Sequence, residues 1–250
     1  MRQSRVAVEE GFGGDQLVHA LRIMMLGAMV LMSSIPAVAG CVSSVGQVTA
    51  QNSYTITEPV TSIKVDNPVG DTEIEGTDAT TISVTERLRY NHNPPQTRYP
   101  VVGAQLTLSY SCPGVFDVNS CSVSYIIKIP RRLAVQIDDQ VGVIKLTGLA
   151  GQLNLTSATG NIDATGLTSN AVTARARAGA ISLQFSAPPN TVAAQTEVGS
   201  ITVRLPAGSA YAVDAGSQIG AADVTVQQDP GSVHHITARS RVGSVSVSNG

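Results

Sequence analysis

Residues 135–183 read VQIDDQVGVIKLTGLAGQLNLTSATGNIDATGLTSNAVTARARAGAISL and contain three copies of one pattern. In each copy an aliphatic residue precedes a glycine by seven positions, and an apolar residue follows that glycine by four. The same spacing recurs on both sides of this stretch, so that seven glycines share it: Gly70, Gly142, Gly160, Gly179, Gly199, Gly220 and Gly243. Apolar and polar side chains alternate around each glycine, which indicates two short β-strands joined at a glycine corner.

The spacing between units is typical of solenoid proteins. From Gly142 onward the glycines are 18, 19, 20, 21 and 23 residues apart. One unit cannot bury its apolar face alone, so successive turns must stack around a continuous core. Glycine suits each corner because it allows a positive φ or a close backbone approach. We therefore predict an all-β, single-stack β-solenoid of the parallel β-helix kind, with turns of about 20 residues. The alternative is a β-sandwich of hairpins, in which the equal offsets would be accidental.

The composition agrees with one extended β domain. The 250 residues include 23 glycines and no tryptophan, and only 14% of them are charged, which suits thin packing of small side chains. The formal net charge of −2 provides no electrostatic attraction for nucleic acid. We therefore expect no nucleic-acid partner.

Residues 1–40 have the features of a secretory signal peptide. An apolar run from Ile23 to Met32 follows Arg22, and the small residues before Cys41 resemble the lipobox of bacterial lipoproteins. This resemblance implies that the sulfur of Cys41 carries a diacylglyceryl group, which anchors the mature chain to the outer face of the cell membrane. The alternative is an uncleaved membrane helix that begins near Ile23, although the apolar run is shorter than the roughly 20 residues of a span. The region before Arg22 is long and mixed in charge, so the true translation start stays open.

The remaining chain divides into a tether and a solenoid domain. Residues 41–58 are rich in Ser, Thr and Gln without strong periodicity and predict a tether, with an irregular first strand as the alternative. The solenoid domain then covers residues 59–250, with an irregular insertion at 79–132. Residues 91–100, NHNPPQTRYP, contain three prolines and predict an exposed loop within this insertion.

The insertion contains two alternating runs, Gln105–Ser111 and Ser122–Ile129, that flank Cys112 and Cys121. They predict an antiparallel hairpin closed by a disulfide between these cysteines, which an exported compartment permits. Closing a loop of about ten residues contributes on the order of 2 to 3 kcal/mol to stability. A zinc site would need a different ligand spacing, and two free thiols are the remaining alternative.

Three features together resemble a known bacterial family. They are Ile63-Lys64-Val65 leading to Gly70, the strand Tyr125–Pro130 and the run of G-x-I-x-V units, and they cover about residues 60–248. This pattern is similar to that of the β-strand-repeat proteins of unknown function that are called putative adhesins. The resemblance implies a solenoid located in the envelope or on the cell surface, and it supplies no catalytic residues.

The sequence predicts no enzyme, cofactor or metal site. Asp163 and Asp223 occupy equivalent outward positions, but three turns would place them about 14 Å apart, which is too far for the paired carboxylates of a glycosidase. Asp138 and Asp139 are neighbours on one strand and point to opposite faces, which we interpret as surface charge. The acidic residues of the first repeat do not match the spacing of a calcium-binding loop.

The candidate recognition surface is the insertion, which gathers tyrosines, arginines and a histidine. Its members are Tyr90, Tyr99, Tyr110, Tyr125, Arg87, Arg89, Arg98 and His92. Tyrosine and arginine dominate the binding energy of interfaces. The same aromatic residues could instead cap the end of the solenoid and protect its edge from pairing with another molecule. The two roles are compatible, and both stay open.

Together these features predict a lipid-anchored, non-catalytic protein of the cell surface. It would present an adhesin-like or scaffolding surface to an envelope or host protein or glycan. The alternatives are a structural or sensory envelope lipoprotein without an external ligand, and a polysaccharide-active enzyme built on the same fold.

Overall fold

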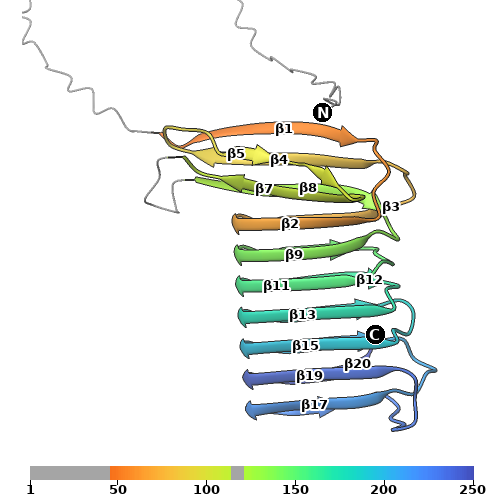
Figure 1. Ribbon diagram of the computed structural model, residues 1–250. Helices are drawn as coiled ribbons and strands as arrows, with labels where there is room; N and C mark the ends of the chain where they lie inside the picture. Colours follow the sequence, from red (N-terminus) through yellow and green to blue (C-terminus); the bar gives the residue numbers. More distant parts are fainter. Residues whose placement is uncertain (1–45, 114–120) are drawn as a thin grey trace, which may run out of the picture. The chain divides into compact units, whose positions relative to one another are not determined.

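The computed structural model describes residues 46–113 and 121–250, and the predicted signal peptide and lipidation site, Cys41, lie outside this part of the chain. Every regular element in the described part is a β-strand, and the strands form two ten-stranded sheets (Figure 1). We call the sheet that contains β1 sheet A and the other sheet B. No helix in the described ranges is long and apolar enough to cross a membrane.

Most of the chain is a stack of strand pairs, which we call rungs, each with its first strand in sheet B and its second in sheet A. In chain order the regular rungs are β2 (Ser62–Val69) with β3 (Thr72–Thr77), β9 (Ala134–Val141) with β10 (Ile144–Thr147), β11 (Leu153–Thr159) with β12 (Ile162–Leu167), β13 (Ala171–Ala178) with β14 (Ile181–Phe185), and β15 (Thr191–Val198) with β16 (Ile201–Leu205). Neighbouring rungs are parallel and in register, so that Ile144, Ile162 and Ile181 lie side by side. The predicted parallel β-solenoid is therefore the observed fold.

The core runs through the stack between the two sheets. Inward positions of successive rungs carry aliphatic residues, as in the row Ile137, Leu155 and Ala174 of sheet B, all fully buried. Polar residues alternate with them on the outer face. Burying one large aliphatic side chain contributes about 1.5 to 3 kcal/mol, and each rung gains this burial only from its neighbours. Stacking therefore supplies the cohesion that a single rung lacks.

The corner glycines form a column of backbone atoms along the stack. Their φ values lie between 132° and 157°, a region that favours glycine. A Cβ atom at Gly160 would lie 1.8 Å from the carbonyl oxygen of Gly142, and one at Gly243 would lie 2.1 Å from that of Gly199. Each corner thus needs glycine for two reasons, its backbone conformation and the close approach of the next rung.

The predicted hairpin of the insertion is wrong, although its disulfide is formed. β7 (Gln105–Ser111) pairs parallel with β2 in sheet B, and β8 (Cys121–Pro130) pairs parallel with β3 in sheet A. The two strands are thus one more rung, and the disulfide between Cys112 and Cys121 closes the segment that replaces the corner glycine. Alternating side chains suit a hairpin and a rung equally, so the sequence pattern did not distinguish them.

The last two rungs are stacked in the reverse of their chain order. One consists of β17 (Ala212–Ile219) and β18 (Ala222–Val224), and the other of β19 (His235–Val242) and β20 (Val245–Asn249). The rung β19/β20 lies between β15/β16 and β17/β18 (Figure 1). The final strands of the chain are therefore paired on both sides, and β17/β18 form one end of the stack, which we call the open end.

Antiparallel strands close the other end of the stack, which we call the capped end. In sheet A, β4 (Ile82–Tyr90) pairs with β8, and β1 (Val48–Ile56) pairs with β4. In sheet B, β5 (Gln96–Arg98) and β6 (Val101–Val102) pair with β7. The tether prediction is wrong for the residues of β1, because this strand completes a sheet and packs Tyr54 into the core.

Candidate binding surfaces

Two tyrosines of the insertion are structural parts of the capped end. Tyr110 and Tyr125 are 9% and 1% exposed. The hydroxyl group of Tyr110 donates a hydrogen bond of 2.6 Å to the carbonyl oxygen of Val69 and accepts one of 2.9 Å from the amide of the same residue. Burial raises the pKa of both tyrosines. Neither side chain is therefore accessible to a binding partner.

A second aromatic pair holds β1 on the capped end. The rings of Tyr54 and Tyr99 stack with their centroids 4.3 Å apart. The Tyr54 hydroxyl donates a hydrogen bond of 2.7 Å to the buried carboxyl group of Glu86, and burial, together with this carboxyl group, raises the pKa of Tyr54. Glu86 was missed as a site residue, although the alternation of β4 places it inward between Val84 and Leu88.

The exposed members of the predicted recognition surface do not form one site. Arg87 and Arg89 point outward from β4 in sheet A, whereas Arg98 lies on β5 in sheet B and His92 in the segment between the two strands. Tyr90 is half-buried at the end of β4. The two arginines of β4 line a groove that also contains acidic side chains. The predicted surface is thus divided between two faces of the stack.

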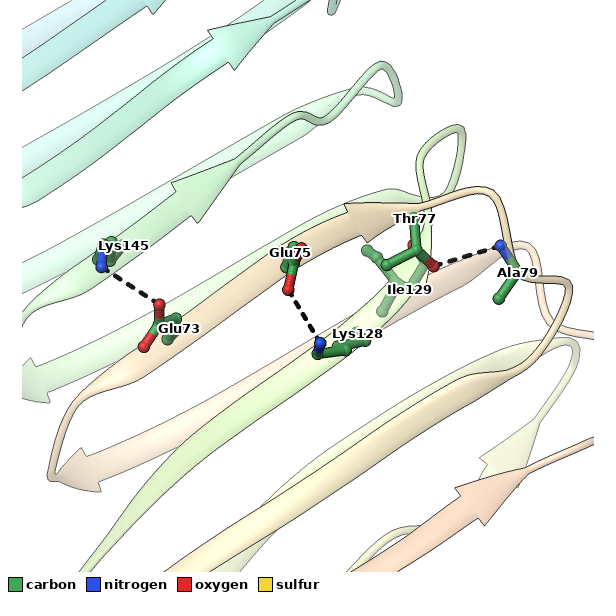
Figure 2. A network of polar contacts seen from close by, with 7 residues as sticks. All are labelled: Glu73, Glu75, Thr77, Ala79, Lys128, Ile129 and Lys145. Carbon is green, nitrogen blue, oxygen red and sulfur yellow. Dashed lines mark hydrogen bonds and ion pairs between the residues drawn. The ribbon is translucent and has the colours of Figure 1, made fainter.

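The outer face of sheet A carries paired charges beside the capped end. The ammonium group of Lys145 lies 3.2 Å from a carboxylate oxygen of Glu73, and that of Lys128 lies 3.3 Å from one of Glu75 (Figure 2). These pairs join β3 to its neighbours β10 and β8 on either side. Exposed pairs contribute at most about 1 kcal/mol each. Because their charges match across the strands, β3 itself offers a partner little unpaired charge.

The outer face of sheet B carries a groove of about 790 Å³ that runs along the stack near the glycine corners. It crosses the strands of sheet B from β2 to β17 and is lined mainly by residues two and four positions before the corner glycines. Toward the capped end it contains Asp66, which lies 2.8 Å from the ammonium group of Lys64. On β13 and β19 its lining includes Arg175, Arg177, Arg239 and Arg241. Glu197 of β15 lies between these two strands. The four arginines outnumber it, so the net charge of the lining changes from acidic to basic along the stack.

Beneath this groove, a column of polar side chains lies three positions before the corner glycines. Its buried members are Asn67, Asp139, Ser157, Thr196 and Ser240. The hydroxyl of Thr196 donates a hydrogen bond of 3.1 Å to the carbonyl oxygen of Gly179, and that of Ser240 donates one of 2.9 Å to the carbonyl oxygen of Gly199. These bonds provide partners for carbonyl groups at the bend of the chain. Thr196 and Ser240 therefore fasten their rungs to the corner of the neighbouring rung, whereas Asn67 and Ser157 bond to the corner glycine of their own rung.

Asp139 is the acidic member of this column and is 3% exposed. It accepts a hydrogen bond of 3.3 Å from the Thr72 hydroxyl, whereas its Oδ2 atom has no hydrogen-bond partner among the described residues. Burial raises its pKa to about 8. The interpretation of Asp139 as surface charge is therefore wrong. Its place three residues before Gly142, which matches that of Ser157 before Gly160, was the signal that marked it as inward.

The described residues include no group of three or more His, Cys, Asp or Glu side chains that could hold a metal ion. Asp163 and Asp223 are four strand spacings apart in sheet A, about 19 Å, because β19/β20 is inserted between their rungs. The prediction of three turns was therefore wrong, and the true separation is still larger than the carboxylate spacing of a glycosidase.

Residues 118–248, more than half of the chain, match the family Toastrack DUF4097. No curated protein matches the sequence significantly. The fold is similar to that of a putative cell adhesion protein from Clostridium sporogenes, with 15% identity and a TM-score of 0.53 over 81% of this chain and 100% of the other. A putative adhesin from Bacteroides fragilis matches over 82% of this chain and 97% of its own, with 17% identity and a TM-score of 0.39. In agreement with the predicted resemblance to the putative adhesins, the chain belongs to the Toastrack DUF4097 family.

Proposed function

We propose that this protein is a non-catalytic, adhesin-like binding protein on the outer face of the bacterial cell membrane, held there by a lipid on Cys41. The groove on sheet B is the observation that carries the proposal. It is continuous over successive rungs and contains a cluster of arginines. Because the rungs are held in fixed register, such a groove is a rigid and extended surface for a partner.

Three observations support the cellular location. The leader before Cys41 resembles a signal peptide with a lipobox. The disulfide between Cys112 and Cys121 is formed, and disulfides persist mainly in oxidising compartments outside the cytosol. A structurally similar protein is called a putative cell adhesion protein.

The groove is a better binding surface than the insertion. Tyr110 and Tyr125 are buried at the capped end, and the exposed arginines of the insertion lie on two different faces. The capping role considered for these aromatic residues accounts for their positions. Binding by the insertion would therefore involve scattered side chains, whereas the groove presents its charged residues along one line.

We infer that the groove serves binding rather than catalysis. Its exposed carboxylates Asp66 and Asp138 are in register on β2 and β9, and both pair with Lys64. Asp139 has a raised pKa, but it lies beneath the surface and is hydrogen-bonded to Thr72. The neighbouring carboxylate of Asp138 is exposed and lies 3.8 Å from the ammonium group of Lys64. General acid–base catalysis needs a group within hydrogen-bond reach of the reacting atom, and the buried carboxyl group of Asp139 does not meet this condition. We therefore assign the groove to binding.

The anchor is tested by mass spectrometry of the N-terminal peptide of the protein recovered from detergent-extracted membranes. We expect a diacylglyceryl group on Cys41. The variant Cys41→Ala should move the protein from the membrane fraction to the soluble fraction. An unmodified peptide that begins upstream of Cys41 would contradict the anchor.

The binding role of the groove is tested with cells that display the full chain and are applied to host cells or extracellular matrix. Thr156→Trp places a bulky ring in the groove on β11 and should abolish attachment. Thr165→Trp is the matched control, because Thr165 is also exposed and lies on β12 of the same rung, in the opposite sheet. Tryptophan suits a strand, so both variants should have the same unfolding temperature as the native protein. Unchanged attachment with Thr156→Trp would refute the role of the groove.

A further inference from the structure

The reversed order of the last two rungs brings four arginines together. β13 and β19 are separated in sheet B by β15 alone. Arg175 and Arg239 are both in register with Gln195 of β15, and therefore lie two strand spacings apart, about 10 Å. Stacking in chain order would have put three spacings between them. Arg177 and Arg241, two residues further along the same strands, are brought together in the same way.

Three of these arginines have no partner within the chain as described. Arg239 forms an ion pair with Asp214 of β17. The side chains of Arg175, Arg177 and Arg241 make no ion pair or hydrogen bond to any residue in the described ranges. Glu197 of β15 lies in the groove between Arg177 and Arg241. Together with Asp214 it sets two carboxylates against the four arginines, so an excess of positive charge stays on these strands, and like charges on nearby strands repel one another. An anion in the groove would relieve this repulsion.

We propose that this basic part of the groove binds an extended acidic polysaccharide in which charged sugars alternate with uncharged ones. The inference rests on the proposed function, because it names the ligand class of the same groove. The groove runs across the strands, so it fits a chain that is longer than one sugar. Its two arginine pairs, on β13 and β19, are two strand spacings apart, about 10 Å, which is close to the length of two sugars in an extended glycan. The arginines therefore match an acid on every second sugar.

The side chains at this place suit both kinds of sugar. A guanidinium group binds a carboxylate or sulfate through two parallel hydrogen bonds. Gln195, on the strand between the arginines, lines the groove and has an amide group that can both donate and accept hydrogen bonds with sugar hydroxyls. Toward the capped end, Asp66 and Asp138 would repel a polyanion. The ligand is therefore confined to the part of the groove between β11, whose lining residues are uncharged, and the open end.

Nucleic acid fits the same groove poorly. Its phosphates are more closely spaced than the arginine pairs. Proteins that bind single strands stack the bases on aromatic side chains, and no aromatic residue lines this groove. Because the groove would recognise the polysaccharide by charge and not by stacking, we expect its affinity for this ligand to fall strongly as ionic strength rises.

The test is a calorimetric titration of the full chain in detergent with a hyaluronate decasaccharide, which carries a carboxylate on alternate sugars. A maltodextrin of equal length is the uncharged control, and a single-stranded DNA oligonucleotide is the control for any polyanion. We expect hyaluronate to bind, and Arg177→Gln with Arg241→Gln to weaken binding about tenfold or more. Arg132→Gln with Arg204→Gln removes the same charge outside the groove and should leave binding unchanged. All variants should keep the native unfolding transition.

The possible results separate this inference from the proposed function. Three results would overturn the proposal of an acidic polysaccharide ligand. They are a failure of hyaluronate to bind, binding of the DNA with equal affinity, and an equal loss of hyaluronate affinity in the two double variants. If Thr156→Trp still abolishes cell attachment in that case, the groove stays a binding surface for another ligand. If hyaluronate binds as expected while Thr156→Trp leaves attachment unchanged, the ligand class is supported and the proposed adhesive function fails.

Discussion

The two ends of the stack are closed in different ways. At the capped end, antiparallel strands from outside the repeat cover the last rung in both sheets. At the open end, the inward residues Val213 and Ala215 of β17 are only half-buried. Their partners one rung further in, Ile236 and Ala238, are 1% and 0% exposed. The same position in the repeat is therefore much less protected at the open end.

This difference shows that a repeat can extend a core but cannot finish it, because every rung is built to have a neighbour on both sides. The capped end is finished by strands with their own sequence. The open end is finished by single residues of the adjoining segments, notably Tyr211 and Val226, which are 0% and 6% exposed. The Tyr211 hydroxyl donates a hydrogen bond of 2.8 Å to the carbonyl oxygen of Pro206. We therefore expect stability to depend more on the capped end than on the open end.

The largest effect is expected in the glycine column, where an interior rung can be compared with the open end. An alanine Cβ atom at Gly243 or Gly220 would lie 2.1 or 2.2 Å from a backbone oxygen of the neighbouring rung. Gly243 is held between two rungs, whereas the rung of Gly220 can move outward. Gly243→Ala should lower the free energy of unfolding by about 3 to 5 kcal/mol, and Gly220→Ala by about 1 to 3 kcal/mol, in urea titrations.

The control for this comparison is Gly208→Ala. Gly208 also has a positive φ, 87°, but nothing lies within 4 Å of its Cβ position. Gly208→Ala should lower the free energy of unfolding by only about 1 kcal/mol, from backbone strain alone. Equal losses at Gly243 and Gly220 would show that the end rung is held as firmly as an interior one.

The next effect concerns the covalent closure of the capped end. Replacing Cys112 and Cys121 by serine should lower the free energy of unfolding by about 2 to 3 kcal/mol, because the unfolded chain gains the freedom of an open loop. Dithiothreitol should destabilise the native protein by the same amount and leave the double variant unchanged. A double variant as stable as the native protein would mean that the other contacts of the rung β7/β8 suffice.

A smaller difference is expected between one tyrosine at each end. Tyr54→Phe removes the hydrogen bond to the buried carboxyl group of Glu86, whereas Tyr211→Phe removes one to a neutral carbonyl group. Bonds to carboxylates contribute more than neutral ones, so we expect losses of about 2 and about 1 kcal/mol, respectively. The thermal unfolding of the two variants, measured side by side, checks this order. A larger loss at Tyr211 would mean that the open end is the more important closure.

The strands and corners of the repeat could be predicted because the same glycine offset recurs in each rung from Gly70 to Gly243. The order of the rungs could not, because Val213 of β17 and Ile236 of β19 have the same offset and either strand could pair with β15. The basic part of the groove depends on that order and was missed with it. In the insertion, alternation predicted strands but not their partners, since the segment between Cys112 and Cys121 hides the missing corner.

The smallest predicted effect concerns the polar column, which carries the acid Asp139 near the capped end and the hydroxyls of Ser240 and Ser217 near the open end. Burial raises the pKa of folded Asp139 to about 8, from an ordinary value of 3.8 that the unfolded chain regains. Between these two pH values the folded state keeps a proton that the unfolded state has lost. The free energy of unfolding should therefore fall as pH rises through this range and level off above about pH 8.

Between pH 7 and pH 9, this fall should be on the order of 1 kcal/mol. Asp139→Asn should remove it in urea titrations, because an amide keeps the shape of the carboxyl group and does not titrate. Asp138→Asn is the matched control, since Asp138 lies on the outer side of the same strand. In this variant the free energy of unfolding should still fall between pH 7 and pH 9. If Asp139→Asn shows the same pH dependence as the native protein, Asp139 is already ionised in the folded state. The column would then hold a buried charge near the capped end, a still stronger contrast with the uncharged hydroxyls at the open end.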